Sequence, residues 1–321
     1  MKWIKVMVLA FVISLFNPTR VRAGAEVLGM HIMQPEEVGE VRNLFEDDVW
    51  RYVTVPYSVD DQNKDRWQEF LAKAGENKLV PLVRLMTRFN GDYWEVPSRY
   101  DVVRATEFLG SLNWPSDRIH VILFNEPNHA PEWGGQVDVA SYVRITSFAA
   151  DWLHTENKNF LVLPAGLDMA AANGGGTVEA YGFLTQVLKV EPKWLDKFNG
   201  WTSHSYPNPG FVGSPYDQSK MSIAGFKREL AFVDRYAVAE LPVYITETGW
   251  KQTEWNEKNL ANYWAYALGQ VWNDKRVKTV TPFVWQGSPG PFEQFSFLNP
   301  DGTPTPQFEA VREVVMEEAG G

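Results

Sequence analysis

The sequence predicts a single-domain (β/α)8 barrel, and three observations support this prediction. Short apolar runs alternate with amphipathic stretches along most of the chain, a pattern typical of a parallel sheet covered by helices. The chain has 321 residues, 45% of them hydrophobic, which suits one barrel of roughly 250–300 residues. Two apolar runs end abruptly in a glutamate, at Glu126 and Glu247, and such barrels carry their reactive groups at the carboxyl ends of the strands.

Eight strands and eight helices complete the expected pattern. The strands are expected, in order, at 27–32, 52–57, 79–86, 121–124, 160–165, 200–204, 243–247 and 279–285. The sequence gives bounds for six of the eight expected helices, at 35–45, 61–74, 100–112, 137–156, 256–272 and 307–317.

Local chemistry accounts for several of these elements. The helix at 61–74 places Trp67, Phe70 and Leu71 on one face at the spacing of an amphipathic helix. Pro127 ends the fourth strand because it has no N–H to donate. Asn256 is suited to cap the helix that follows it. The glycine run 174–176 is interpreted as a loop, since neither a phosphate-loop nor a dinucleotide pattern surrounds it.

The N-terminus has the pattern of a secretory signal peptide. Lys2 and Lys5 precede an apolar run at 6–16, and Ala23 ends a stretch suited to cleavage. Eleven apolar positions fall short of the ~20 that a membrane-spanning helix needs, which disfavours the alternative of a membrane anchor. We therefore expect residues 1–23 to be removed and 24–321 to form the catalytic domain. The mature protein is expected to be secreted or periplasmic, with no stable membrane association.

Charge and cysteine content exclude several classes of function. The formal net charge is −10, and loss of the four basic residues of the expected signal peptide makes it −14. An acidic protein does not favour nucleic acids or anionic membranes. The chain has no cysteine, which excludes disulfides, thiol nucleophiles and thiolate metal sites. It is expected to be a monomer that needs no cofactor and no metal.

The two strand-end glutamates are expected to face each other across the barrel. In the fourth strand Ile122 and Phe124 share the two-residue period with Glu126, and in the seventh Val243 and Ile245 share it with Glu247. The alternation of side chains along a strand thus places each glutamate on the same face as the apolar residues before it. Two carboxyls at the ends of two strands make a pair.

A pair of carboxyls among neutral polar and aromatic groups suits cleavage of a glycosidic bond. One carboxylic acid protonates the leaving oxygen, and the other carboxylate attacks the anomeric carbon or activates water. Asn125 could hold a sugar hydroxyl beside the reacting carbon, and Tyr206 or His204 could orient the nucleophile and keep it ionised. The other polar or aromatic strand-end residues are His31, Arg84 and Trp285, and Trp285 is expected to contact the substrate.

These motifs together resemble the clan A retaining glycoside hydrolases, loosely families 5 and 39. The motifs are Asn125-Glu126-Pro127 after the fourth strand, His204-x-Tyr206 after the sixth, Thr246-Glu247-Thr248-Gly249-Trp250 after the seventh and Trp285 after the eighth. The resemblance implies that Glu126 is the acid/base and Glu247 the nucleophile. It also implies that Asn125 meets the sugar 2-hydroxyl and that Tyr206 lies against the nucleophile.

One departure from the clan concerns arginine. Many members carry an arginine at the end of the second strand, whereas this strand ends Val55-Pro56-Tyr57. The nearest candidates are Arg51, at its start, and Arg84, on the third strand. Arg84 is open to two interpretations, a structural salt bridge and a contact in the substrate site.

Three alternatives to a retaining glycoside hydrolase are considered. A metal-dependent hydrolase would need clustered histidines, but the first strand carries His31-Ile32-Met33 rather than His-x-His, and the five histidines are scattered. A catalytically inactive sugar-binding barrel would have the same fold. A transglycosylase would use the same residues and pass the sugar to another sugar instead of water.

Aromatic residues in the expected rim loops indicate the substrate class. Trp94, Trp133 and Trp250 lie in loops after the third, fourth and seventh strands, where their rings could stack on sugar faces. An acidic chain with such loops favours neutral β-linked polysaccharides or oligosaccharides over acidic ones. Several stacking positions would suit an open cleft and internal cleavage.

Overall fold

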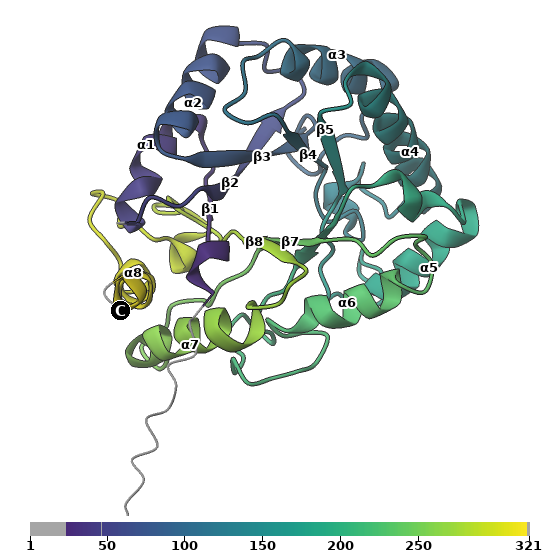
Figure 1. The fold of residues 1–321 in the computed structure, drawn as a ribbon. Helices are drawn as coiled ribbons and strands as arrows, with labels where there is room; N and C mark the ends of the chain where they lie inside the picture. Colours follow the sequence, from purple (N-terminus) through teal and green to yellow (C-terminus); the bar gives the residue numbers. More distant parts are fainter. Residues whose placement is uncertain (1–23, 46, 320–321) are drawn as a thin grey trace, which may run out of the picture.

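The computed structural model describes residues 24–45 and 47–319, and its strands form a ring surrounded by helices (Figure 1). The strands are β1 (Met30–His31), β2 (Arg51–Ser58), β3 (Leu79–Met86), β4 (Ile119–Leu123), β5 (Phe160–Pro164), β6 (Trp201–His204), β7 (Val243–Glu247) and β8 (Val277–Val280). The helices are α1 (Val38–Val41), α2 (Lys64–Glu76), α3 (Arg99–Gly110), α4 (Val139–Glu156), α5 (Ala180–Val190), α6 (Gly225–Val233), α7 (Leu260–Tyr266) and α8 (Pro306–Ala319). The expected signal peptide, 1–23, lies outside the described residues.

The strands pair in parallel, in chain order, within two sheets. One sheet holds β1 to β5 and the other β6 to β8. Backbone hydrogen bonds join the sheets at both edges: Asn199 N–H donates to Val162 O at 2.9 Å, and Gly29 N–H donates to Val280 O at 2.8 Å. With helices between successive strands, this architecture confirms the predicted (β/α)8 fold.

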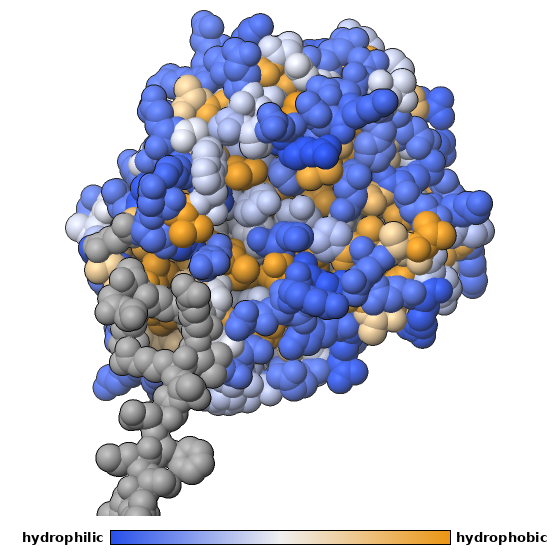
Figure 2. Space-filling model, viewed as in Figure 1, coloured by the Kyte–Doolittle hydropathy of each residue, from blue (hydrophilic) through white to orange (hydrophobic). Residues whose placement is uncertain are grey.

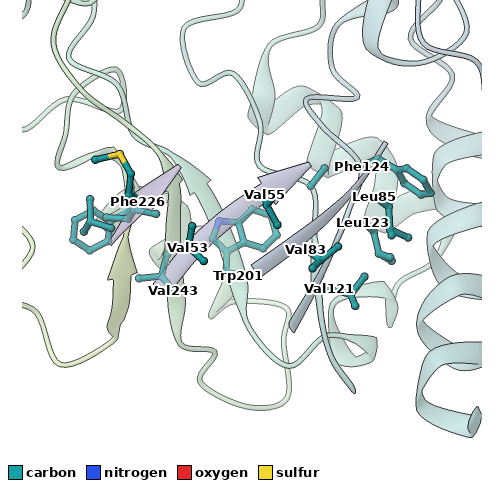
Figure 3. Packing of buried hydrophobic residues seen from close by; sticks show 14 of the residues in the cluster. Val53, Val55, Val83, Leu85, Val121, Leu123, Phe124, Trp201, Phe226 and Val243 are labelled. Carbon is teal, nitrogen blue, oxygen red and sulfur yellow. The ribbon is translucent and has the colours of Figure 1, made fainter. Parts of the chain in front are cut away.

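Side chains alternate between two layers along the strands. Odd-numbered residues such as Val53, Val83 and Val121 belong to the large core between strands and helices, whose packing Figure 3 shows. Even-numbered residues such as Leu82 and Ile122 form a small separate cluster in the interior of the ring. The interior is thus filled by side chains and the site must lie above it.

Two strands are shorter than their apolar runs predicted. The chain before β1 forms a short 3-10 helix (Ala25–Val27), so that the strand begins only at Met30. β8 ends at Val280, although the chain after it still bonds on both sides: Phe283 N–H donates to Thr248 O, and Trp285 N–H donates to His31 O. The chain therefore leaves the regular ladder before reaching the rim.

The surface in the view of Figure 2 is mostly hydrophilic, with small hydrophobic areas separated by polar ones. Within the part of the chain that the structure describes, no helix combines the length and hydrophobicity needed to cross a membrane.

A buried carboxyl lies between α6 and β6. The Glu229 side chain is fully buried and accepts hydrogen bonds from Trp201 Nε1 at 2.8 Å and from Ser203 Oγ at 2.5 Å. Burial raises the pKa of Glu229 to about 7, against the effect of both hydrogen bonds. The folded protein therefore favours the protonated acid at this position.

Glu229 should make the stability of the protein fall as the pH rises. Because the folded-state pKa lies above the unfolded one, the stabilisation is complete below about pH 4.5 and is lost as the pH passes through 7. We expect the free energy of unfolding to fall by on the order of 2 kcal/mol between pH 5 and pH 8 from this group. Glu229→Gln keeps a donor and an acceptor without a charge, and urea denaturation at the two pH values should show a smaller fall.

Glu229→Leu is the matched control, because it leaves Trp201 and Ser203 without their acceptor and should cost roughly 1–3 kcal/mol at both pH values. Equal pH dependence in the wild type and Glu229→Gln would contradict the assignment.

Candidate active site

Glu247 is the last residue of β7, and a bulge directs its side chain into the site. Ser203 pairs with Ile245, but the next residue of β6, His204, pairs with Glu247, so Thr246 is an extra residue. Val243 and Ile245 lie in the outer core. The prediction that Glu247 shares their face is therefore wrong, because the bulge reverses the alternation.

Glu126 reaches the site through strained backbone. β4 ends at Leu123, and Phe124 and Glu126 then adopt left-handed φ angles of 71° and 27°, a conformation costly for bulky residues. Ile122 faces the barrel interior, whereas Phe124 packs in the outer core against Trp133. The predicted shared face of Ile122, Phe124 and Glu126 is also wrong. Strain of this kind concentrates at functional sites.

Glu247 is held as a carboxylate by groups from β3 and from β6 with its loop. Arg84 of β3 forms an ion pair with its Oε1, and Tyr206 donates a hydrogen bond to Oε2 at 3.1 Å. His204 Nδ1 lies 3.8 Å from Oε2. Burial opposes ionisation of Glu247, but the charges of His204 and Arg84 outweigh it and lower its pKa to about 2. Burial and the charge of Glu247 raise the pKa of Tyr206, so its hydroxyl stays a donor.

Glu126 is more accessible and is held by a different contact. Its side chain is 22% exposed, compared with 11% for Glu247. His204 Nδ1 lies 2.7 Å from Glu126 Oε1. Gly166 makes this contact possible, because a Cβ there would lie 2.3 Å from the His204 ring. The charges of both carboxyls raise the pKa of His204 against the effect of burial, which acts to lower it.

The two carboxyls and His204 lie close enough to act on one bond. In the described part of the chain, one oxygen of each glutamate and one His204 nitrogen all lie within 4.8 Å of one another. These three atoms could also be metal ligands. The guanidinium of Arg84 already neutralises Glu247, however, so the charge balance favours an ion-paired carboxylate over a bound cation.

Arg84 and Asn125 form one connected unit with the nucleophile candidate. Arg84 pairs with Ile122 in the β3–β4 register, which brings its side chain level with the end of β4. Its Nη1 donates to Asn125 Oδ1 at 2.9 Å as well as to Glu247. Arg84 thus makes a salt bridge within the site itself, which joins the two interpretations that the sequence left open.

Three tryptophans expected to contact the substrate have other roles. Trp133, Trp250 and Trp285 are at most 1% exposed. Trp133 packs on Phe124, Trp250 on Trp264, and Trp285 on Phe308 of α8. Their expected substrate contacts are therefore wrong, because buried rings have no face to offer. Trp94 is partly exposed and lines a small cavity together with Asn125, so its assignment remains a prediction.

Two more residues lie at the site: His31, which the sequence placed at a strand end, and Glu132, which it did not indicate. His31 is fully buried, lies 3.9 Å from Glu247 and contacts Phe283 edge to face. Burial lowers the pKa of His31 to about 3, so this ring is neutral. Glu132, in the loop after β4, also belongs to the site, because it lines a small cavity together with Asn125 and Trp94.

His129 and Asp168 form a pair beside Glu126. His129 Nε2 lies 2.8 Å from Asp168 Oδ2, and the hydrogen bond raises the pKa of His129. The backbone N–H of His129 donates to Glu126 O at 2.9 Å, which ties the pair to the acid/base candidate. Both side chains remain partly exposed.

The geometry provides two chemically different carboxyls. Glu247 is a buried, ion-paired carboxylate suited to attack a carbon. Glu126 is more exposed, lies beside His204 and has no cationic side chain bonded to it apart from this imidazole among the described contacts. Such unequal environments are how two carboxyls take different roles in one reaction.

Comparison with known proteins identifies the fold. No protein-family model and no curated protein sequence matches the chain. Among solved structures, it is similar to a monomeric β-xylosidase from Caulobacter crescentus, with 15% identity, a TM-score of 0.61, and coverage of 91% of this chain and 69% of that one. It is also similar to a glucosidase from Croceicoccus marinus, with 12% identity, a TM-score of 0.67 and coverage of 94% and 69%.

A third similar structure is an endo-1,4-β-mannanase from Rhizomucor miehei, with 11% identity, a TM-score of 0.55, and coverage of 93% of this chain and 94% of that one. Other matches come from glycoside hydrolase families 39, 51 and 5. The expected resemblance to clan A is thereby confirmed at the level of the fold: the chain is a (β/α)8 barrel of the type found in clan A glycoside hydrolases.

Proposed function

We propose that the protein is a retaining glycoside hydrolase that cleaves β-glycosidic bonds, with Glu247 as nucleophile and Glu126 as acid/base. The observation that carries the proposal is the pair of unequal carboxyls, whose nearest oxygens lie within 4.8 Å. Retaining enzymes keep their carboxyls about 5–5.5 Å apart, whereas inverting enzymes separate them by roughly 6.5–9.5 Å to admit a water molecule.

In the first step, an oxygen of Glu247 attacks the anomeric carbon and the bond to the leaving oxygen breaks. Glu126 gives its proton to that oxygen, so that the leaving group departs as a neutral alcohol. Arg84 and Tyr206 hold Glu247 in one orientation. Asn125 presents its amide to the sugar hydroxyl beside the reacting carbon.

In the second step, water replaces the leaving group. Glu126, now a carboxylate, takes a proton from the water as its oxygen bonds to the anomeric carbon and the ester to Glu247 breaks. His204 Nδ1 lies 2.7 Å from Glu126 and 3.8 Å from Glu247. The imidazole can therefore interact with whichever of the two carboxyls carries the negative charge at each step.

The proposed substrate is a neutral β-linked polysaccharide or oligosaccharide. The negative net charge of the chain disfavours acidic glycans, and Trp94 and exposed Trp255 offer aromatic faces in the loops after β3 and β7. We further propose that residues 1–23 are a cleaved signal peptide and that 24–321 act outside the cytoplasm as a monomeric catalytic domain.

The two glutamates should respond differently to mutation. Glu247→Ala should lose detectable turnover and regain activity with azide as an α-glycosyl azide, because azide fills the place of the nucleophile. Glu126→Ala should retain activity on 4-nitrophenyl β-glycosides, whose leaving group needs no proton. Matched Glu247→Gln and Glu126→Gln variants control for volume. Equal behaviour of the two alanine variants on an activated aryl glycoside would contradict the roles assigned here.

The first-formed product should have the β configuration. Proton NMR of a reaction on the best substrate from a panel of neutral β-glucans, β-mannans and β-xylans should show the β-anomer before mutarotation. An initial α-anomer would exclude double displacement. Preferred cleavage of acidic glycans would exclude the neutral substrate class, and accumulation of longer saccharides would indicate transfer to sugar rather than water.

Arg84 should set the acidic limit of activity. Its positive charge helps to keep the pKa of Glu247 at about 2, and the nucleophile must be ionised. In Arg84→Met the Glu247 pKa rises, so the acidic limb of the kcat/KM profile should move to higher pH, by about 1–3 pH units. Arg84→Lys keeps the charge and should move the limb less. An unchanged limb in Arg84→Met would show that the ion pair does not govern Glu247.

A further inference from the structure

Backbone hydrogen bonds join the loops after β4 and β5 beside the acid/base candidate. Ala130 N–H donates to Gly176 O at 2.7 Å, and Val178 N–H donates to Asn128 O at 2.9 Å. The three glycines at 174–176 all have positive φ angles, which residues with a side chain rarely adopt. The glycine run therefore lets the loop after β5 turn back onto the loop after β4.

The side chain of Asn128 fixes the position of Asp168 at this junction. Asn128 is fully buried, and its Nδ2 donates to Asp168 O at 3.0 Å and to Val178 O at 3.1 Å. The Asp168 N–H donates back to Asn128 Oδ1 at 3.2 Å. The Asp168 carboxylate in turn accepts the Ala170 N–H at its Oδ1, at 2.7 Å. Asp168 is thus held by the fold at both its backbone and one carboxylate oxygen.

The Asp168 carboxylate faces the mouth of the barrel. Its neighbours Leu167 and Met169 are buried in the outer core, so the side chain between them points the other way. Asp168 also forms a parallel bridge with His204, and laterally paired residues of parallel strands share a face. Because His204 Nδ1 reaches Glu126 at 2.7 Å, Asp168 faces the same site.

The His129 ring is bonded at one nitrogen and open at the other. Its Nε2 lies 2.8 Å from Asp168 Oδ2, and because a carboxylate only accepts, this nitrogen carries the hydrogen. Nδ1 has no hydrogen bond to any residue in the described part of the chain, and the side chain is 28% exposed. A hydroxyl group can donate to Nδ1 when the ring is neutral and accept from it when the ring is protonated.

The location of the His129–Asp168 pair indicates which part of a substrate it would meet. Among the contacts of the described residues, neither side chain of the pair bonds to Glu247 or to its partner Arg84. The backbone N–H of His129 instead donates to Glu126 O at 2.9 Å. The leaving oxygen must lie beside Glu126 to take its proton. The pair therefore lies on the leaving side of the bond.

We propose that the His129–Asp168 pair binds the sugar on the leaving side of the cleaved bond. His129 Nδ1 makes a hydrogen bond to a hydroxyl of that sugar, and Asp168 is a positioning residue that holds the ring. The inference rests on the proposed function and adds to it that the leaving group is itself a neutral sugar. The protein should therefore favour glycans over glycosides whose leaving group offers no such hydroxyl.

The test compares two substrates that differ only in the leaving group. One is the neutral β-linked oligosaccharide that the wild type cleaves fastest, and the other is the 4-nitrophenyl β-glycoside with the same sugars before the cleaved bond. His129→Phe keeps a ring without nitrogen. It should lower kcat/KM by roughly 3- to 10-fold on the oligosaccharide, as expected for one lost hydrogen bond, and by less than about twofold on the aryl glycoside.

Variants of Asp168 test its action through the ring. Asp168→Ala should show the same selective loss, whereas Asp168→Asn keeps an acceptor for Nε2–H and should stay within about threefold of the wild type. The double variant His129→Phe/Asp168→Ala should be no slower on the oligosaccharide than His129→Phe alone. Thermal unfolding reports whether each variant folds, and His129→Ala replaces His129→Phe if the phenylalanine variant does not.

His154 of α4 offers a matched control, because its Nε2 lies 2.8 Å from Asn199 Oδ1 and it makes no contact with either glutamate among the described residues. His154→Phe should change kcat/KM on both substrates by less than about twofold, since no hydrogen bond to substrate is lost.

Several outcomes would overturn the inference while leaving the proposed function intact. They are oligosaccharide rates in His129→Phe equal to those of the wild type, equal losses on the two substrates, a selective loss of the same size in His154→Phe, and a wild type that cleaves aryl glycosides but no oligosaccharide. A wild type that cleaves neither kind of substrate would instead refute the proposed function, so the two failures are distinguishable.

Discussion

The burial of one carboxylate, Glu247, imposes conditions on much of the barrel. A buried negative charge is tolerated only if positive or hydrogen-bonding groups surround it. Here these groups are Arg84 of β3, His204 of β6 and Tyr206 in the loop after β6. Each of these strands must therefore end at a level that brings its side chain within reach of the Glu247 carboxylate. The requirements of a single charge explain why the rim of the barrel is polar while the layer beneath it is apolar.

Charge compensation also connects the two halves of the proposed reaction. His204 lies between both carboxyls, and Arg84 bonds to both Glu247 and Asn125. The interactions that hold the nucleophile therefore also order the groups around the acid/base. A substitution at either residue would disturb several contacts at once, so its effects should not add to those of its neighbours.

The sequence was sufficient to predict the alternation of strands and helices and the strand ends that carry Glu126 and Glu247, because buried parallel strands leave clear apolar runs. It could not reveal the bulge at Thr246 or the left-handed turn at Phe124, since both arise from pairing and packing between distant segments. The prediction of a shared face failed at these two points, although the glutamates still come together.

Aromatic residues were the least predictable part of the site. A tryptophan in a loop can fill the core or stack on a sugar, and composition does not distinguish the two. Trp133 is covered by Tyr142 and Trp250 by Trp264, rings from the helix that follows each loop. Arg84 could be placed only once the β3–β4 register was known. Glu132 became part of the site through hydrogen bonds between two loops, which leave no pattern in either.

The division of the strands into two sheets has a mechanical consequence. Glu126 follows β4 in the five-stranded sheet, and Glu247 ends β7 in the three-stranded sheet. The distance between the two carboxyls therefore depends on the seams between the sheets rather than on the regular ladder within either. A small opening of a seam would separate the carboxyls while both sheets kept their shape. Heat or denaturant would then stop the proposed bond cleavage before the loss of secondary structure could be measured.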